Sequence, residues 1–316
     1  MADCVSVGVL VADHICAPID HLPVEGELIL SDRLELAIGG CASNAAMDLA
    51  RVGVSVDVVG CVGDDAFGRF VTETLESAHV GTGLIRRLPD VGTSASLIIN
   101  VVGQDRRFVH SRGANGRLTA ADIPLDAVRK AKVLYVGGFL LASALTGAEL
   151  AEVFQAARAA GVTTLLDVVV PGPGNHWKQL EAVLPFTDVF LPNDDEGLAI
   201  LGIDDPRRQA ERYRAAGAKS VVVTCGGDGT YLLTDELRLK ANVFPMPFIG
   251  GTGAGDAFDA GYIAGLLQGL DPIECVTWGS ALGASCVRSI SATESVFTRD
   301  EAQRFLKENR LTFEKW

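Results

Sequence analysis

The sequence has few features of a secreted, membrane-spanning or zinc-binding protein. It contains only seven cysteines, scattered along 316 residues, and no pair has the Cys-x-x-Cys spacing of a zinc or redox site. This pattern suggests neither a disulfide framework nor a zinc site, and it favours small core residues in a reducing compartment. The longest apolar runs are far shorter than a membrane span, and no basic region followed by an apolar segment opens the chain. We therefore expect a cytoplasmic protein without a membrane partner.

Positive charge is also scarce. The chain has 27 Lys and Arg against 40 Asp and Glu, which gives a formal net charge of −13. Such a surface repels nucleic-acid phosphates, so we expect no nucleic-acid partner. The only tight basic group, Arg106, Arg107 and Arg112, is better explained as the solvated face of a hairpin than as a ligand contact. A small anionic ligand therefore needs a local positive site elsewhere.

The chain also lacks any feature that would divide it. It has no internal repeat, low-complexity tract or long linker. With 48% hydrophobic and 21% charged residues, it is long and apolar enough to bury a sizeable core. We expect residues 1–316 to form one α/β domain.

Glycine, in contrast, is concentrated at one point. Residues 248–258 hold four glycines and one carboxylate where a loop is expected to become a helix. Glycines let backbone N–H groups turn toward a phosphate, and the first helical turn adds unpaired N–H groups and the positive end of the helix dipole. Asp256 lies in that first turn. On the residues alone it either complements the dipole or takes part in chemistry.

Polar residues follow the expected elements near the start of the chain. The apolar run 5–11 predicts a buried strand that carries Asp13 to its C-terminal edge, where open α/β sheets bind ligands. A helix is expected after Gly39 and Gly40, and Asn44 within it has an amide suited to sugar hydroxyls. The alternatives are an ordinary turn aspartate and a tight contact between helix and sheet that leaves Asn44 merely exposed.

Strands and helices alternate along the rest of the chain, which predicts a mostly parallel sheet with right-handed crossovers. The expected strands are 56–62, 133–136, 163–167, 189–191 and 220–224, and the expected helices are 146–160, 254–268, 273–288 and 299–308.

Two segments interrupt this alternation. Residues 13–36 carry several prolines, and residues 92–112 indicate two strands around a turn at Gly103, Gln104 and Asp105. We expect these two segments to form a small antiparallel sheet that stands off the main body.

In this order, the motifs resemble those of the PfkB family of carbohydrate kinases, the ribokinase-like sugar kinases, over nearly the whole chain. The most specific element is the stretch 250–258, which resembles the family signature Asp-Thr-x-Gly-Ala-Gly-Asp-x-Phe. The resemblance implies a three-layer ribokinase-like α/β fold, with a mostly parallel central sheet flanked by helices and a small β-sheet lid formed by 13–36 and 92–112. The supporting motifs are Gly39-Gly40 with Asn44, residues 60–68, Asn193-x-x-Glu196 and Thr224-x-Gly226-x-x-Gly229.

The resemblance also implies roles for individual residues. Asp256 would be the catalytic base, and the backbone of Gly253, Ala254 and Gly255 would form an anion hole for the transferring phosphoryl group. Substrate hydroxyls would be bound by four residues near the start of the chain. These four are Asp13, Gly39, Gly40 and Asn44.

A second set of residues would bind the cofactors, ATP and Mg²⁺. Thr224, Gly226, Gly229 and Asn193 match positions that lie against the nucleotide, and Glu196 with Asn193 matches a water-mediated magnesium site. Without the resemblance, residues 193–196 indicate a helix N-cap followed by acidic first-turn residues. The lid would close over the substrate and exclude water, and relatives suggest a homodimer through it.

Some positions depart from the family pattern. The signature usually opens with Asp-Thr, whereas Gly250 and Gly251 stand here, which argues against activation by a monovalent cation such as potassium. No Asn-x-Arg pattern follows Asp167, which weakens a ketodeoxygluconate kinase assignment. Gly137 and Gly138 stand near the place of a substrate-binding glutamate of ribokinase, so ribose is not secure either.

Three other functions compete with a sugar kinase. A nucleoside kinase of the same family needs apolar or aromatic residues to stack on a base, and Phe108, Val109 and Phe139 allow it. A dinucleotide-dependent oxidoreductase is disfavoured because the N-terminal strand is not followed by Gly-x-Gly-x-x-Gly. A catalytically silent ligand-binding relative is disfavoured by the presence of Asp256. The small-molecule substrate, a sugar or a nucleoside, stays open.

Overall fold

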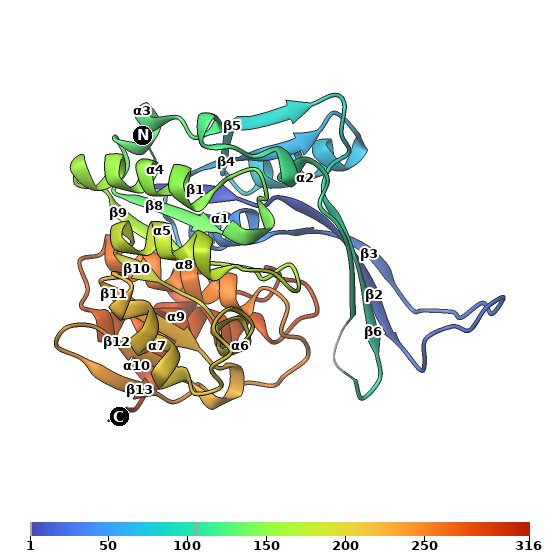
Figure 1. Ribbon diagram of the computed structural model, residues 1–316. Helices are drawn as coiled ribbons and strands as arrows, with labels where there is room; N and C mark the ends of the chain where they lie inside the picture. Colours follow the sequence, from blue (N-terminus) through green and yellow to red (C-terminus); the bar gives the residue numbers. More distant parts are fainter. Residues whose placement is uncertain (1, 105–106) are drawn as a thin grey trace.

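In the computed structural model, which describes residues 2–104 and 107–316, ten strands form one large sheet (Figure 1). Its order is β14-β13-β12-β11-β10-β9-β8-β1-β4-β5, and the seven strands from β11 to β5 are parallel. The other three continue the sheet in antiparallel pairs. The bounds are β1 (Cys4–Gly8), β4 (Val56–Gly63), β5 (Gly81–Leu88), β8 (Val133–Gly137), β9 (Thr163–Leu166), β10 (Val189–Phe190), β11 (Ser220–Thr224), β12 (Thr230–Leu233), β13 (Arg238–Ala241) and β14 (Phe313–Lys315).

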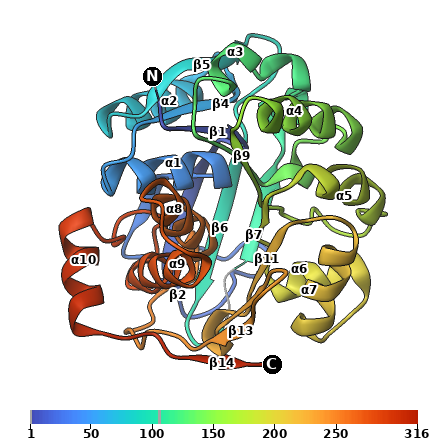
Figure 2. The ribbon, with the colours of Figure 1, turned by 90° about the vertical axis from the view of Figure 1, so that its left-hand side faces the viewer.

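Helices cover both faces of this sheet, as Figure 2 shows. One layer consists of α1 (Cys41–Arg51), α2 (Ala66–Ser77), α8 (Ala254–Leu267), α9 (Pro272–Cys286) and α10 (Arg299–Glu308). The other consists of α3 (Leu125–Val128), α4 (Gly147–Ala159), α5 (Trp177–Val183), α6 (Asp194–Leu201) and α7 (Pro206–Ala215). Short 3₁₀ turns lie at Gly113–Arg117, Ala120–Asp122, Phe139–Leu141, Leu184–Phe186 and Gly226–Asp228.

The strands of the sheet are buried on both faces because each face meets one helical layer. In β1, Cys4 belongs to the core under α1 and α8, whereas Val5 and Val7 belong to the core under α4. Side chains alternate between the two faces of a strand, so an unbroken apolar run serves both cores. The expected three-layer fold with a mostly parallel central sheet is confirmed.

A second, four-stranded sheet stands off the body on the right of Figure 1. It was expected to be antiparallel, and this is wrong for its central pair, because β2 and β6 are parallel. Both strands follow parallel strands of the large sheet, β1 and β5, and leave the body in the same direction. Residues 20–33 form no strand, and Asp105 and Arg106 of the expected turn lie outside the described residues. The strands are β3 (Leu34–Gly39), β2 (Val11–Ile19), β6 (Ala95–Val101) and β7 (Arg107–Ser111).

The expected first strand, 5–11, is wrong in where it ends. β1 ends at Gly8, and β2 begins at Val11 in the other sheet. Between them, Leu10 donates its N–H to Oδ1 of Asn115 at 3.1 Å and accepts from Nδ2 at 3.0 Å. This buried amide satisfies the backbone where the chain changes sheets. Asp13 thus lies inside a strand of the small sheet.

The expected helices are confirmed to within a few residues, and their sequences explain their starts. Capping boxes, in which the N-cap side chain and a glutamate three residues later satisfy each other's backbone N–H, open α4, α9 and α10. β5 and the antiparallel extension β12 to β14 were not expected. Among the described residues, none of the helices combines the length and the apolarity needed to cross a membrane.

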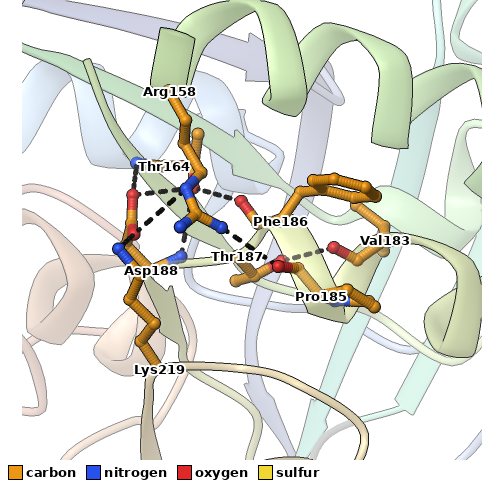
Figure 3. A network of polar contacts seen from close by, with 8 residues as sticks. All are labelled: Arg158, Thr164, Val183, Pro185, Phe186, Thr187, Asp188 and Lys219. Atoms are coloured by element: carbon orange, nitrogen blue, oxygen red, sulfur yellow. Dashed lines mark hydrogen bonds and ion pairs between the residues drawn. The ribbon is translucent and has the colours of Figure 1, made fainter. Parts of the chain in front are cut away.

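A polar network ties the N-terminal ends of β9, β10 and β11 together (Figure 3). Asp188 accepts the N–H of Thr164 at 3.0 Å and pairs with Lys219 at 2.7 Å. Arg158 donates to the carbonyl of Pro185 at 3.0 Å. These contacts occupy the amino ends of the strands with structural hydrogen bonds and an ion pair. Ligand chemistry is therefore expected at the opposite end of the sheet, beyond the carboxyl ends of the strands.

Candidate active site

The first turn of α8 and the first turn of α1 meet at that end of the sheet. Asn44 on α1 donates Nδ2 to Oδ2 of Asp256 on α8 over 2.8 Å. Asn44 is buried, whereas Asp256 is partly exposed. The structure thus joins a predicted substrate-binding residue to the predicted base.

The first turn of α8 has the backbone of an anion site. Its N-cap, Gly253, has φ 80°, and a Cβ there would lie 2.5 Å from Ala292, so only glycine fits. No atom lies within 4 Å of a Cβ built on Gly255, which shows that space is open beside it. The first amides of a helix have no helical acceptor and carry the positive end of its dipole. Among the described residues, the Ala254 N–H donates to the Gly251 carbonyl at 3.3 Å, whereas the N–H groups of Gly253 and Gly255 have no backbone acceptor and are available to a phosphoryl group.

Two further groups surround Asp256. Ligand atoms of Cys41, Asp167 and Asp256 lie within 4.8 Å of one another. Asp167 follows β9 and accepts the N–H of Gly138 at 2.9 Å. Burial and then the charge of Asp256 raise the pKa of Asp167 to about 8. Burial also raises the pKa of Asp256, against hydrogen bonds from Asn44 and Cys41 that lower it.

A buried pair lies one turn further along α8. The hydroxyl of Tyr135 on β8 donates to Oδ2 of Asp259 at 2.8 Å, and both residues are buried. Burial, then the charge of Asp167, raises the pKa of Asp259 well above its usual range. The site therefore contains more carboxyl groups than the sequence indicated. In the sequence, the only feature that points to Asp259 is its position three residues after Asp256.

Asn193, Glu196 and Thr224 lie together at the ends of β10 and β11. Asn193 Oδ1 accepts the N–H of Glu196 at 2.8 Å, and Glu196 Oε2 accepts the N–H of Asn193 at 2.9 Å. This capping box confirms the expected N-cap of α6. A parallel bridge joins Asn193 to Thr224. Burial, then the charge of Asp167, raises the pKa of Glu196 well above its usual range, which indicates that Glu196 belongs to the same electrostatic cluster.

The loop after Thr224 is open and depends on glycine. Gly226 and Gly229 have φ values of 50° and 99°. A Cβ on Gly229 would lie 2.1 Å from the carbonyl oxygen of Ala241, whereas nothing lies within 4 Å of a Cβ on Gly226. The loop closes through the Cys225 N–H, which donates to the Gly229 carbonyl at 2.8 Å. It presents exposed backbone beside Asn193.

Asp13 reaches the site from the small sheet. A Cβ on Gly39 would lie 1.9 Å from Oδ2 of Asp13, so glycine is needed for this carboxyl to pack on the backbone of β3. Gly40, the N-cap of α1, has φ 91°. Burial raises the pKa of Asp13 to about 6, and the charge of Asp256 adds to the shift. All four predicted substrate-binding residues therefore lie where the two sheets join. Hollows of about 410 and 260 Å³ lie elsewhere and include none of them.

Comparison with known proteins identifies the family of the chain. The family described as pfkB family carbohydrate kinase matches residues 1–299. The chain belongs to this family. PfkB membership makes it a carbohydrate kinase, a phosphotransferase that acts on a sugar hydroxyl, and excludes the dinucleotide-dependent oxidoreductase.

The pfkB relatives of the chain are named as kinases of different sugars. The chain is 27% identical to an uncharacterized sugar kinase of Archaeoglobus fulgidus, over 79% of this chain and 98% of that one. It is 25% identical to ribokinase of Haemophilus influenzae, over 95% and 97%. It is 26% identical to 5-dehydro-2-deoxygluconokinase of Clostridium tetani, over 86% and 85%.

Solved structures show the same pfkB fold. Ribokinase of Giardia lamblia superposes with a TM-score of 0.84 at 21% identity, over 97% of this chain and 99% of that one. Ribokinase of Arabidopsis thaliana, complexed with ribose and ATP, gives 0.82 at 24%, over 97% and 99%. A putative ribokinase II of E. coli, in complex with ATP and Mg²⁺, gives 0.81 at 20%, over 98% and 100%. These likenesses confirm the ribokinase-like fold.

Proposed function

We propose that the protein is an ATP- and Mg²⁺-dependent sugar kinase that transfers the γ-phosphoryl group of ATP to a sugar hydroxyl. The observation that carries the proposal is the position of Asp256 in the first turn of α8, held by Asn44 beside the Gly253–Gly255 backbone. We place the activity in the cytoplasm, where ATP is available and the seven free thiols stay reduced.

In this proposal Asp256 is the base. Its carboxylate accepts the proton of the substrate hydroxyl as that oxygen bonds to the γ-phosphorus and the bond from phosphorus to the ADP oxygen breaks. Burial raises the pKa of Asp256 and so improves it as a proton acceptor. Asn44 orients the carboxylate, and the amides at Gly253, Ala254 and Gly255 stabilise the charge on the transferring group.

Thr224, Gly226 and Gly229 are proposed to hold the nucleotide with Asn193. The open glycine loop lets phosphate oxygens approach the backbone. Carboxyl and amide oxygens of Glu196 and Asn193 suit water-mediated Mg²⁺. Burial, and then the charge of neighbouring carboxylates, raises the pKa values of Asp167 and Glu196, and a bound cation would offset that repulsion. When bound, Mg²⁺ neutralises charge on the ATP phosphates.

The substrate is proposed to lie against Asp13, Gly39, Gly40 and Asn44, under the small sheet. Segments 13–36 and 92–112, within one kinase domain of residues 1–316, act as a lid. A lid that closes on the sugar excludes water, which would otherwise take the phosphoryl group. The small sheet is suited to this because its strands run outward from the site itself.

The face of the lid that carries His14 is proposed to form a homodimer. In register, His14 lies between Leu36 and Leu97, and Leu97 lies opposite Val109. Leu36, Leu97 and Val109 are 38%, 43% and 64% exposed. Exposing such a row of apolar side chains to water costs free energy. The same face of a second copy of the protein could cover it.

A nucleoside kinase is the second candidate function, and one observation supports it. Phe108 lies opposite Ile98 in the register of β6 and β7, on the face that carries Asp13, and half of it is exposed. An aromatic ring on that face is the residue type that stacks on a nucleobase. Release of ADP from ATP and Mg²⁺ across sugars, sugar acids and nucleosides separates the two candidates. Turnover with nucleosides alone would overturn the sugar kinase assignment.

A further inference from the structure

Three polar residues form a row across the small sheet. Asp13 on β2, Ser96 on β6 and His110 on β7 lie directly opposite one another in the strand registers. Residues opposite one another in a sheet point to the same face. Ser96 Oγ lies 3.1 Å from Nδ1 of His110. Ser96 is also the direct neighbour of Asp13 in the strand register, and its hydroxyl lowers the pKa of the Asp13 carboxyl group, as a hydrogen-bond donor does. Ser96 therefore links His110 to Asp13.

This face is the one turned toward the reaction site. Ile15, Ala37 and Ile98 share it and pack with Ile290, which lies in the segment after α9. The same segment lies against the glycine loop, since a Cβ on Gly250 would be 3.2 Å from the Cα of Ile290. His110 thus extends from the face that covers the start of α8.

The direction of the hydrogen bonds follows from counting protons. An ionised Asp13 only accepts, so the single hydroxyl proton of Ser96 is donated to it. Ser96 Oγ must then accept from His110, which places the ring proton on Nδ1 and leaves Nε2 as a hydrogen-bond acceptor. His110 is exposed on the edge strand β7, and its partial desolvation and then the charge of Arg112 lower its pKa, a shift toward the neutral ring.

We propose that His110 is a further substrate-positioning residue, whose Nε2 accepts a hydrogen bond from a hydroxyl of the sugar that Asp13 also holds. This rests on the proposed sugar kinase function and narrows its substrate class. Asp13 and His110 offer acceptors, so they select a ligand that brings donors. An uncharged polyhydroxy sugar does so, whereas the carboxylate of a sugar acid has only acceptors and is repelled by Asp13. The charge of Arg112, which acts on His110, opposes this repulsion, so Arg112 is tested separately.

The variants His110→Gln and His110→Asn separate the two ring nitrogens. Glutamine places an acceptor near the position of Nε2, and asparagine can only replace the contact of Nδ1 with Ser96. Ser111→Ala is the matched control, because Ser111 is the next residue of β7 and points to the opposite face. Unfolding temperatures of the variants report any loss of fold separately.

Calorimetric binding of D-ribose, D-fructose and D-gluconate, without ATP, tests the proposal. We expect the wild type to bind an uncharged sugar, His110→Asn and His110→Ala to weaken this about 10-fold, and His110→Gln to stay within about 3-fold, since one hydrogen bond is at stake. In turnover, KM should rise by the same factor with kcat nearly unchanged.

Unchanged affinity in His110→Ala would overturn the role of His110. Failure of the wild type to bind either uncharged sugar, or a preference of the wild type for D-gluconate, would overturn the substrate class. Loss of such a preference in Arg112→Gln would assign it to Arg112. Because binding is measured without ATP, a protein that binds sugar through His110 and transfers no phosphoryl group would contradict the kinase proposal alone.

Discussion

Asn44 and Asp256 are 212 residues apart in sequence and are joined by a 2.8 Å hydrogen bond from Nδ2 to Oδ2. The other amide atom of Asn44, Oδ1, is buried and has no hydrogen-bond partner among the described residues. A buried acceptor without a donor is costly. A substrate hydroxyl can supply that donor, so one side chain links the proposed base to the proposed substrate.

Asn44→Ala should therefore impair the reaction more than the fold. Without the amide, Asp256 loses its orienting donor, and we expect kcat/KM to fall by about 10- to 100-fold, as when one positioning hydrogen bond is lost. Steady-state ADP release measures this. Met47, three residues on in α1 and only partly buried, provides the control Met47→Ala. An equal loss in both variants would contradict a specific role for Asn44.

Asp167 should make the wild type less stable as pH rises. Burial, then the charge of Asp256, raises its pKa from 3.8 to about 8, so the folded state binds the proton more tightly between these values. Stability is then fully present below about pH 4 and is lost as pH rises toward 8. Asp167→Asn removes this loss. The melting temperature of Asp167→Asn minus that of wild type should therefore be larger at pH 8.5 than at pH 5, by about 2 °C or more. A pH-independent difference would contradict the shift.

Glu196→Gln should raise the Mg²⁺ concentration needed for half-maximal turnover. The amide still caps α6 through its oxygen but brings no charge to the proposed cation site. Asp195 is a neighbouring acidic residue in the first turn of the same helix and serves as the control through Asp195→Asn. An Mg²⁺ titration of turnover gives the comparison. Coincident curves for Glu196→Gln and wild type would refute the site.

The apolar face of the small sheet should hold a dimer together. Leu97→Asp places a charge in the row between His14 and Val109, and we expect it to convert a dimer into monomers in light scattering. Leu198 on α6 is 44% exposed, against 43% for Leu97, so Leu198→Asp is a matched control that should leave the dimer intact. A monomeric wild type, or a dimer that tolerates Leu97→Asp, would contradict the interface.

The sequence predicted the layers of the fold because the signals for them are local. Alternating apolar runs placed the parallel strands and most of the long helices, and the capping boxes at Thr146 and Thr298 explain where two of those helices begin. The break between β1 and β2 was not predicted, because the amide that satisfies it belongs to Asn115, far along the chain. The sequence therefore predicted one strand over 5–11 where the structure has the ends of two strands in different sheets.

The site was only partly predictable for the same reason. Asp256, Asn44 and Glu196 stand in recognisable motifs, whose roles remain predictions. Tyr135 gave no local signal, because its importance comes from a contact with Asp259 between two distant elements. The match of the pfkB family to residues 1–299 confirmed the family that these motifs indicated.

The most direct test of the account is ADP release by wild type and Asp256→Asn across sugars, sugar acids and nucleosides, with ATP and Mg²⁺. The asparagine preserves shape and can still accept from Asn44, but it is not a base. We predict turnover with an uncharged sugar that falls roughly 10²-fold or more in Asp256→Asn, while ATP binding and the melting temperature stay near wild type. Near-normal turnover by Asp256→Asn would contradict its role as the base. ATP binding by a wild type that turns over no substrate would indicate a silent ligand-binding relative instead.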